Sequence, residues 1–381
     1  MKKQNKLNIR LASLSLLIAA SIASSNSMAS VAEVAALFPV SIPAKVGSVS
    51  GAKFVGIPVA RPSVYEGSVT TLVPASPSSA STLIPDTGLD TLTVDALGIG
   101  SVGTGRISDE VFATEDNQYV IEFTTGPNIG LVKTVSAVGV NGITVVGGMK
   151  SSLAVGTTYI LRKDWTLGSL FGNDAVSVAA SGLKTGLASS ADHVGVVRNA
   201  KLELFYFNTS WKTTGTTVAG TAYEHVRVPL SGGFYFKRNT TTPTTLYMTG
   251  VYRPHRLQAL LEGGSGSLHT VSTPNFNETT LAATGLHRYV KSNTAVGSAD
   301  EVRLVGANGS IKTYFNAGSG SGYTSGFWNG TSAAAPAWRE STSGFAPGSA
   351  NTLVIPAGTA ILLKKNGADS RLIGIDPDYT K

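Results

Sequence analysis

Two short strings with the local pattern of nucleophilic chemistry, one around a serine and one at an aspartate, stand out in this chain, and five histidines are available as bases. Ser332 lies in the string Gly330-Thr-Ser-Ala-Ala-Ala-Pro336, and Asp86 begins the string Asp86-Thr-Gly88. A serine attacks a carbonyl group only when a histidine accepts its proton and a carboxylate orients that histidine. A serine hydrolase therefore needs a histidine that the fold places beside the serine, in a motif that the sequence should contain.

The serine and aspartate strings are similar to the nucleophile and aspartate motifs of subtilisin-like proteases, and they occur in that family's order. The best match to the family's histidine motif is Thr214-Gly-Thr-Thr-Val-Ala-Gly-Thr221, with Thr214 in place of the base. Threonine cannot accept the serine proton. The family's serine also opens a buried helix, whereas residues 337–349 contain turn-forming glycine and proline and no apolar helical stripe. We therefore expect Ser332 to lie in a surface loop, with a serine hydrolase as the least favoured function.

Other acid–base and metal chemistry lacks the residues that it needs. An aspartic protease shares one proton between two carboxylates, and Asp86-Thr-Gly88 has no second copy. Metal-binding histidines are typically paired on one helical face or as His-x-His on one strand. The histidines, which lack this spacing and are expected to be solvated, are His193, His225, His255, His269 and His287. We predict no catalytic residue, no cofactor and no metal ion.

Two aspartates occupy equivalent places before predicted strands. Asp192 lies in Ala191-Asp-His-Val194, and Asp300 lies in Ala299-Asp-Glu-Val302. An aspartate at such a place typically accepts hydrogen bonds from nearby backbone, whereas a calcium site needs several clustered oxygens. We predict the capping role and keep a calcium ligand as the alternative.

Four aromatic residues in Gly/Ser/Thr-rich loops are the candidate contacts for a ligand or a partner. Flat rings in loops stack on sugars or anchor a partner protein. Rings that close the ends of a sandwich are the structural alternative, which we favour. The four residues are Trp211, Tyr323, Trp328 and Trp338.

The elements that carry these residues contain one pattern twice. Val228-Pro-Leu-Ser-Gly-Gly-Phe-Tyr-Phe-Lys-Arg-Asn239 and Ile355-Pro-Ala-Gly-Thr-Ala-Ile-Leu-Leu-Lys-Lys-Asn366 lie 127 residues apart (366 − 239). Each has a proline, a glycine-containing turn and three large apolar residues, and ends in two cations and an asparagine. This pattern predicts a turn and then a buried strand, whose cations keep the strand end in water and discourage edge pairing.

Further matches lie between the same two parts of the chain. Tyr206-Phe-Asn208 and Tyr314-Phe-Asn316 are 108 residues apart (316 − 208), as are Asp192 and Asp300. The separation grows to 127 after a Gly/Ser/Ala-rich insertion at residues 317–347. An order that is kept while a loop grows indicates an old duplication of one folded unit. Each copy is then a small sandwich, or the pair completes one larger core.

Short alternating segments between residues 87 and 164 predict a separate β domain. Examples are Gln118-Tyr-Val-Ile-Glu-Phe123 and Gly142-Ile-Thr-Val-Val146, and Gly-Pro-Asn and Val-Asn-Gly turns separate such segments. This spacing is typical of an antiparallel barrel or sandwich. Composition agrees, because 14% charged residues and 43 glycines favour many short strands with tight turns.

The N-terminus has the pattern of a secretory signal. Lys2, Lys3, Lys6 and Arg10 precede the apolar run 11–22, and Ser27-Met-Ala29 is a small-x-small cleavage site. We expect cleavage after Ala29, with an uncleaved anchor as the alternative, and no later membrane span. Four of the 30 cations and none of the 23 anions lie in the signal, so the remainder carries 26 cations and 23 anions, an excess of +3. Without a basic cluster, this charge gives no support to nucleic-acid binding, and the absence of cysteine excludes disulfides.

The order of motifs resembles a family of exported, uncharacterised, β-rich bacterial proteins. The motifs are Trp165-Thr-Leu-Gly-Ser-Leu-Phe-Gly172, the Ala-Asp-x-Val strings, the Tyr-Phe-Asn strings, Trp338-Arg339 and the Pro-x-Gly turns before strands. The resemblance extends from about Val55 to the end and implies export and β architecture, with no assigned reaction. The first copy departs from the pattern, because Lys212 follows Trp211 where an arginine is expected.

The sequence thus predicts an all-β, antiparallel protein with an N-terminal β-barrel or sandwich followed by two tandem related β-sandwich-like modules. The expected segments are a signal peptide at 1–29, a leader at 30–50 that is a short helix or mobile, an N-terminal β domain at 51–164, a first repeat module at 165–253, a linker at 254–273 with one helical turn and a flexible joint, and a second repeat module at 274–381.

The leading functional hypothesis is an exported, non-enzymatic structural or cell-surface assembly protein that associates with itself or with an envelope or extracellular polymer. Modules rich in sheet and poor in charge suit repeated contacts with identical copies. The alternative is a carbohydrate-binding or adhesion module that uses the loop aromatics. We expect an extracellular or cell-surface location, with the periplasm as the other compartment.

Overall fold

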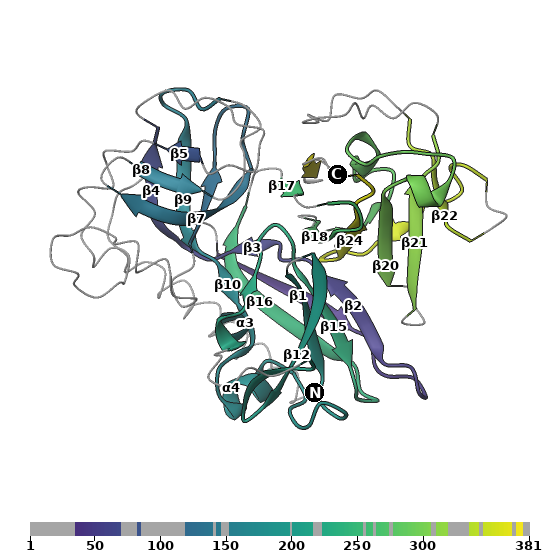
Figure 1. Cartoon of the computed structure of the whole chain (residues 1–381). Coiled ribbons are helices and arrows are strands. Elements are labelled where there is room, and N and C mark those ends of the chain that lie inside the picture. Colours follow the sequence, from purple (N-terminus) through teal and green to yellow (C-terminus); the bar gives the residue numbers. More distant parts are fainter. Residues whose placement is uncertain are drawn as a thin grey trace, which may run out of the picture.

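The computed structural model shows a mostly β protein with antiparallel sheets and a few short helices (Figure 1). It describes residues 35–69, 82–84, 119–139, 142–145, 152–198, 200–215, 223–253, 257–261, 264–273, 277–305, 310–318, 335–342, 346–367 and 371–375. The prediction of an antiparallel, β-rich protein is confirmed.

Two five-stranded sheets have the same strand order. The first sheet has the order β13-β12-β11-β15-β2, with β13 at Ser210–Thr213, β12 at Lys201–Asn208, β11 at His193–Arg198, β15 at Phe234–Arg238 and β2 at Gly51–Val55. The second has the order β22-β21-β20-β24-β18, with β22 at Trp338–Glu340, β21 at Ile311–Asn316, β20 at Glu301–Val305, β24 at Ala360–Lys364 and β18 at Leu268–Ser272. The predicted strands at the end of each repeated pattern are therefore present as β15 and β24.

Each five-stranded sheet is accompanied by a short strand pair. Strand β10 (Trp165–Thr166) pairs with β14 (Arg227–Val228), and β19 (Thr279–Thr280) pairs with β23 (Val354–Ile355). In each case, the second member of the pair leads through a glycine turn into β15 or β24.

A six-stranded sheet, at the far side of the molecule from the second five-stranded sheet in Figure 1, forms most of the N-terminal part. Its order is β4-β9-β6-β7-β8-β5, with β4 at Ser63–Ser68, β9 at Thr158–Lys163, β6 at Tyr119–Phe123, β7 at Val132–Gly139, β8 at Gly142–Val145 and β5 at Thr82–Ile84. Its outer strands do not pair with each other in the described part of the chain. The sheet is therefore open there, and the predicted alternative of a closed barrel is not formed by these residues.

The remaining strands pair across the boundaries of the segments that were predicted from the sequence. Strand β1 (Ala35–Ile42) pairs with β16 (Thr244–Tyr252), and β16 pairs with β3 (Val59–Ala60). Strand β17 (Leu257–Leu261) pairs with β25 (Arg371–Ile375). Half of the described part of the predicted leader, Ala35–Ile42, is thus a strand rather than a helix.

The predicted linker also differs from its expected structure. Most of its described residues form β17 and β18, whereas the sequence predicted a helical turn and a flexible joint. Strand β2 pairs with β15 across the predicted boundary between residues 164 and 165. The division of the chain into separately folding domains stays a prediction.

The glycine turns before β15 and β24 require glycine. Gly233 has φ +81°, and a Cβ there would lie 2.2 Å from the carbonyl oxygen of Val55. Gly358 has φ +63°, and a Cβ there would lie 2.4 Å from the ring of Phe38. Residues other than glycine rarely adopt this left-handed backbone conformation. The predicted glycine turns are therefore confirmed, and at each turn the backbone lies close to an N-terminal strand.

Apolar clusters hold the sheets together. The largest cluster contains Phe234 and Phe236 of β15 and the buried face of the β1–β16 ribbon, including Phe38 and Met248. A smaller cluster contains residues from both five-stranded sheets: Phe54, Ala360 and Leu362, packed with Val197, Tyr235, Leu268 and Val305. The two five-stranded sheets therefore share an apolar contact.

Two short helices, which were not predicted from the sequence, lie beside the first five-stranded sheet. Helix α3 (Leu167–Phe171) is capped by Thr166 and α4 (Ala175–Ala180) by Asp174, each through a capping box with a serine. They contribute Phe171 and Val178 to the largest cluster. Among the described helices, none has the length and apolar character needed to cross a bilayer.

Candidate functional site

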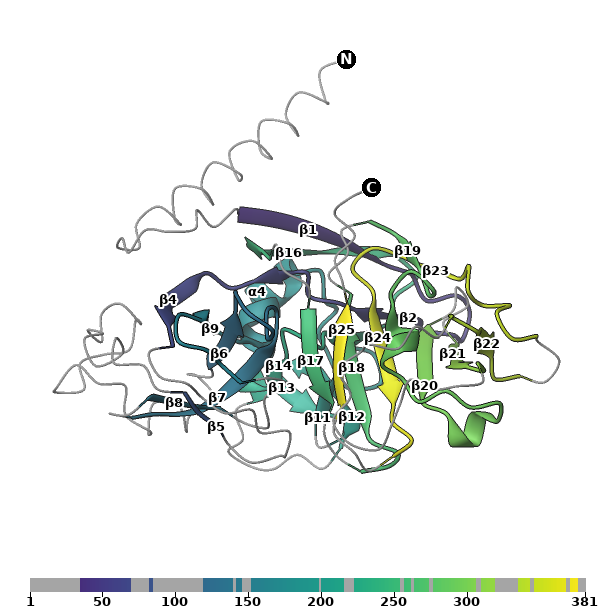
Figure 2. The ribbon, with the colours of Figure 1, turned by 90° about the horizontal axis from the view of Figure 1, so that it is seen from above.

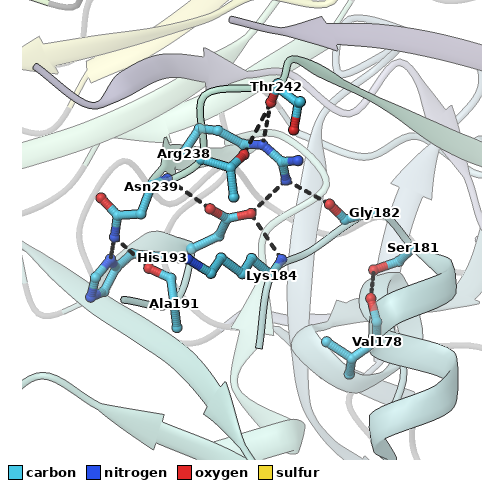
Figure 3. Close-up of polar contacts among 11 residues, drawn as sticks. Val178, Ser181, Gly182, Lys184, Ala191, His193, Arg238, Asn239 and Thr242 are labelled. Atoms are coloured by element: carbon cyan, nitrogen blue, oxygen red, sulfur yellow. Dashed lines mark hydrogen bonds and ion pairs between the residues drawn. The ribbon is translucent and has the colours of Figure 1, made fainter. Parts of the chain in front are cut away.

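The carboxylate of Asp192 is fully buried just before β11. Its Oδ2 accepts hydrogen bonds from the backbone N–H of Lys184 at 2.9 Å and from Nη1 of Arg238 at 2.6 Å. Its Oδ1 accepts from the backbone N–H of Asn239 at 2.7 Å. Arg238 and Asn239 reach this carboxylate from the end of β15, and Lys184 reaches it from the loop before β11 (the three residues are labelled in Figure 3). Asp192 therefore ties two distant segments to the start of β11.

Asp300 makes the corresponding contacts just before β20. Its Oδ2 accepts from the backbone N–H of Lys291 at 2.7 Å, and its Oδ1 accepts from the backbone N–H of Asn366 at 2.6 Å. Asp300 is 1% exposed. The predicted capping role of both aspartates is confirmed. No group of three or more metal-binding side chains occurs among the described residues, and the calcium alternative has no support there.

The cation pairs at the strand ends are not solvated as predicted. Lys237 and Lys364 are half-buried, but Arg238 is 7% exposed and Lys365 is fully buried. Arg238 donates to the carbonyl oxygens of Gly182 at 2.7 Å and Thr242 at 3.1 Å as well as to Asp192. Alternation along a strand explains the difference, because adjacent side chains point to opposite faces. The second cation of each pair therefore points into the protein.

Two of the histidines are buried rather than solvated. His193 on β11 is 5% exposed, and its Nδ1 lies 3.3 Å from Nδ2 of Asn239. Burial, followed by the charge of Lys237, lowers the pKa of His193. Burial, followed by Arg288, likewise lowers the pKa of His287. Both rings are thus favoured in the neutral form and act as packed residues. His255 lies outside the described residues.

The predicted aromatic contacts divide into two pairs. Trp211 and Trp338 are 2% and 0% exposed and lie in β13 and β22 rather than in loops. The indole N–H of Trp211 donates to the carbonyl oxygen of Gly172 at 2.9 Å. Neither ring has a face open to a ligand in this conformation, in agreement with the structural alternative. Tyr323 and Trp328 lie outside the described residues, and their binding role stays a prediction.

The serine and aspartate strings that resemble protease motifs also lie outside the described residues, at Ser332 and Asp86. Thr214, at the position of the missing base, is described. Its backbone N–H donates to the carbonyl oxygen of Leu204 at 2.9 Å, so Thr214 extends the pairing of β13 with β12.

An exposed strip on the β1–β16 ribbon is the candidate functional surface. Directly paired residues lie on the same face of a sheet. Leu37 pairs with Thr249 and Pro39 with Tyr247, and these residues are exposed, whereas the alternate residues are buried. Leu37 is 41% exposed and Tyr247 is 64% exposed. We call these residues, with Ser41 and Thr245, the outer strip; Figure 2 shows its strands along one margin of the molecule.

The outer strip contains no charge. Neither β1, with the sequence AALFPVSI, nor β16, with the sequence TTLYMTGVY, contains a charged residue. Exposed edge strands usually carry lysine or another charge that discourages association. Periodicity within β1 could have indicated the strip, because Phe38, Val40 and Ile42 alternate with its exposed residues. The strip was not predicted from the sequence, because its first strand falls in the segment that was expected to be a leader.

Comparisons with known proteins give no further guide to the site. No family model, no curated protein and no solved structure matches the chain.

Proposed function

We propose that the protein is an exported, non-enzymatic structural or cell-surface assembly protein that associates with copies of itself through the outer strip. The observation that carries this proposal is the exposure of Leu37 and Tyr247 on one uncharged face. Burying a large apolar side chain stabilises a contact by about 1.5–3 kcal/mol. Packing of the outer strip against another surface would therefore be energetically favourable.

A second copy suits the outer strip better than a charged partner does. Without the four cations of the proposed signal, the chain has an excess of +3 (26 − 23), so two copies repel each other weakly wherever like-charged surfaces meet. An uncharged strip meets its own copy without that repulsion, and a two-fold axis brings the same residues together from both sides. Pro39 in β1 lacks an N–H group and hinders the addition of a further strand at that edge. The proposed contact is thus face to face.

We also propose that residues 165–253 and 274–381 are two related β modules that arose by duplication. The four strands that each segment contributes to its sheet follow the same order, β13-β12-β11-β15 and β22-β21-β20-β24, which supports this. The matching carboxylate contacts of Asp192 and Asp300 support it further. The proposed kinship with a family of exported, β-rich bacterial proteins rests on the order of motifs alone.

Export predicts a defined start of the mature chain. If the cationic head and apolar run of residues 1–22 act as a signal, the secreted protein begins at Ser30. N-terminal sequencing of protein recovered from the medium and from the envelope fraction measures this directly. A chain that starts at Met1 in every fraction would contradict the proposal of a cleaved signal.

Self-association predicts a specific response to charges on the outer strip. Leu37→Glu and Tyr247→Glu each place a like charge opposite its copy and remove apolar contact, so each is expected to weaken association roughly tenfold or more. Sedimentation velocity over a wide range of concentration measures the effect, and electron microscopy shows whether ordered filaments or lattices form.

The matched control is Leu187→Glu, because Leu187 is 67% exposed and lies outside the outer strip. It is expected to leave association unchanged. A wild-type protein that stays monomeric at every concentration would contradict self-association. Equal effects of all three variants would contradict the assignment to the outer strip.

A carbohydrate-binding or adhesion role is the second candidate, favoured by the exposed ring of Tyr247 beside Pro39. Such a flat surface can stack on a sugar. Tyr323 and Trp328 remain proposed contacts for this role. Binding on a glycan array that is lost in Tyr247→Ala, with a monomeric wild type, would support this candidate over self-association.

A further inference from the structure

A cavity of about 590 Å³ lies between the N-terminal strands and the second five-stranded sheet. Strands β1 and β2 line it on one side, and β20, β21 and the turn after β23 line it on the other. Pockets of this volume hold small organic ligands. Neither Asp192 nor Asp300 lines the cavity.

The wall of the cavity is mainly apolar. Phe54, Leu304, Val305, Leu353 and Ile355 are among its lining residues. An apolar wall favours a ligand with a hydrocarbon or aromatic body, because contact removes apolar surface from water.

Two lysines line the cavity, and no acidic residue does so in the described part of the chain. Lys312 already has a partner, since its Nζ lies 3.3 Å from Oε2 of Glu340. Lys53 forms no ion pair among the described residues. Burial, the only cause, lowers the pKa of Lys53 from its ordinary value. The charge of Lys53 is therefore desolvated without a carboxylate to compensate for it.

Tyr314 adds a hydrogen-bond donor to the same cavity. Burial, followed by the charge of Glu340, raises the pKa of Tyr314. Its phenol therefore stays protonated and can donate to an anionic group.

We propose that this cavity binds a small amphipathic anion, with one carboxylate at Lys53 and an apolar body against Phe54 and Leu304. An ion pair inside a partly dry pocket is stronger than the same pair in water. The apolar lining alone would accept a neutral ligand equally well, so the selectivity for an anion comes from Lys53. The inference does not depend on the outer strip or on self-association.

Octanoate is a suitable probe, because it joins one carboxylate to a short hydrocarbon chain. Isothermal titration calorimetry of the full chain with octanoate is expected to show saturable binding of one molecule per chain. Octanol, which has the same apolar body and no charge, is expected to bind roughly tenfold more weakly, because it lacks the charge-assisted contact. Absence of saturable octanoate binding, or equal binding of octanol, would overturn the proposal.

Two variants test the assigned position. Lys53→Met keeps the length of the side chain, removes the charge, and is expected to weaken octanoate binding roughly tenfold or more. Val354→Trp, at a lining residue that is 51% exposed, fills the cavity from its mouth and is expected to abolish binding without disturbing the core. Circular dichroism establishes that each variant is folded.

Lys201→Met is the matched control, because Lys201 is exposed on β12 and does not line the cavity. It is expected to bind octanoate as the wild type does. Unchanged binding in both Lys53→Met and Val354→Trp would place octanoate elsewhere and refute the proposed site. If Lys53→Met fails to fold, unchanged binding in Val354→Trp alone is enough to refute it.

Discussion

Asp192→Ala is expected to lower the free energy of unfolding by about 3–5 kcal/mol, the cost of removing one partner of a buried ion pair. The substitution leaves the guanidinium of Arg238 inside the protein without its carboxylate. It also removes the acceptor for the backbone N–H groups of Lys184 and Asn239. Buried donors without acceptors are costly because they have lost their water. Urea-induced unfolding followed by tryptophan fluorescence measures the change.

Asp174→Ala is the control for this measurement. Asp174 also accepts backbone hydrogen bonds, from Val176 and Ser177, but it does so at the exposed start of α4. Loss of such an exposed cap costs much less than loss of one partner of a buried ion pair. Asp192→Ala must therefore be clearly more destabilising than Asp174→Ala. Equal effects of the two substitutions would show that burial and the pairing with Arg238 do not matter.

Asp300→Ala extends the comparison to the second five-stranded sheet. Its carboxylate accepts from the backbone N–H groups of Lys291 and Asn366, as Asp192 accepts from those of Lys184 and Asn239. The same loss of buried acceptors is expected. A large effect at one aspartate and none at the other would argue that the two contacts are not equivalent.

The local pattern of the sequence was enough to predict strands and turns. Three large apolar residues after a glycine turn indicate a buried strand, and β15 and β24 are such strands. The equivalence of Asp192 and Asp300 followed from spacing alone. Their contacts with the preceding loop, at Lys184 and Lys291, could be anticipated because a short carboxylate side chain accepts from nearby backbone at a strand start. Their contacts with Asn239 and Asn366, which are far away in the sequence, could not.

The partners of the strands could not be predicted in the same way. Strand β2 pairs with β15 although more than 170 residues separate Val55 from Phe234 (234 − 55 = 179). An alternating pattern shows which face of a strand is buried but not which strand lies beside it. The pairing of β1 with β16 was missed for the same reason. Long-range packing, rather than local propensity, decides these neighbours.

The tryptophans show a second limit of sequence interpretation. Trp211 is surrounded by threonine, serine and glycine, which indicated a loop. The residue lies instead on the short strand β13, where its ring packs against Phe171 and Phe207 at centroid distances of 5.9 and 5.7 Å. A four-residue strand has too little sequence to reveal its period. The polar neighbours therefore concealed a core residue.

A buried ion-pair cluster around Glu122 is the second place where one substitution should have a large effect. Glu122 on β6 is 1% exposed. Its Oε1 accepts from Nε and Nη2 of Arg253 at 2.9 and 2.6 Å, and its Oε2 lies 3.4 Å from Nε of Arg162 on β9. Arg253 follows β16, so this cluster connects the six-stranded sheet to the ribbon that carries the outer strip.

Glu122→Gln keeps the shape of the side chain but leaves two guanidinium groups buried without their anion. It is expected to lower the free energy of unfolding by about 3–5 kcal/mol. Lys312→Ala is the control, because the pair of Lys312 with Glu340 is partly exposed and such pairs contribute about 1 kcal/mol or less. Urea unfolding measures both variants.

Hydrogen exchange shows where the stability of the Glu122 variant is lost. Glu122 lies on β6 and Arg162 lies on β9. The increase in amide exchange rate from wild type to Glu122→Gln is therefore expected to be larger in these two strands than in β20 and β21. Arg253→Met combined with Glu122→Leu removes both partners of the strongest pair. It should cost less than the sum of Arg253→Met and Glu122→Leu made singly, because the guanidinium of Arg253 is then no longer left buried without its carboxylate, although that of Arg162 still is. Additive losses, or a Glu122→Gln protein within about 1 kcal/mol of the wild type, would mean that the cluster does not couple the six-stranded sheet to β16.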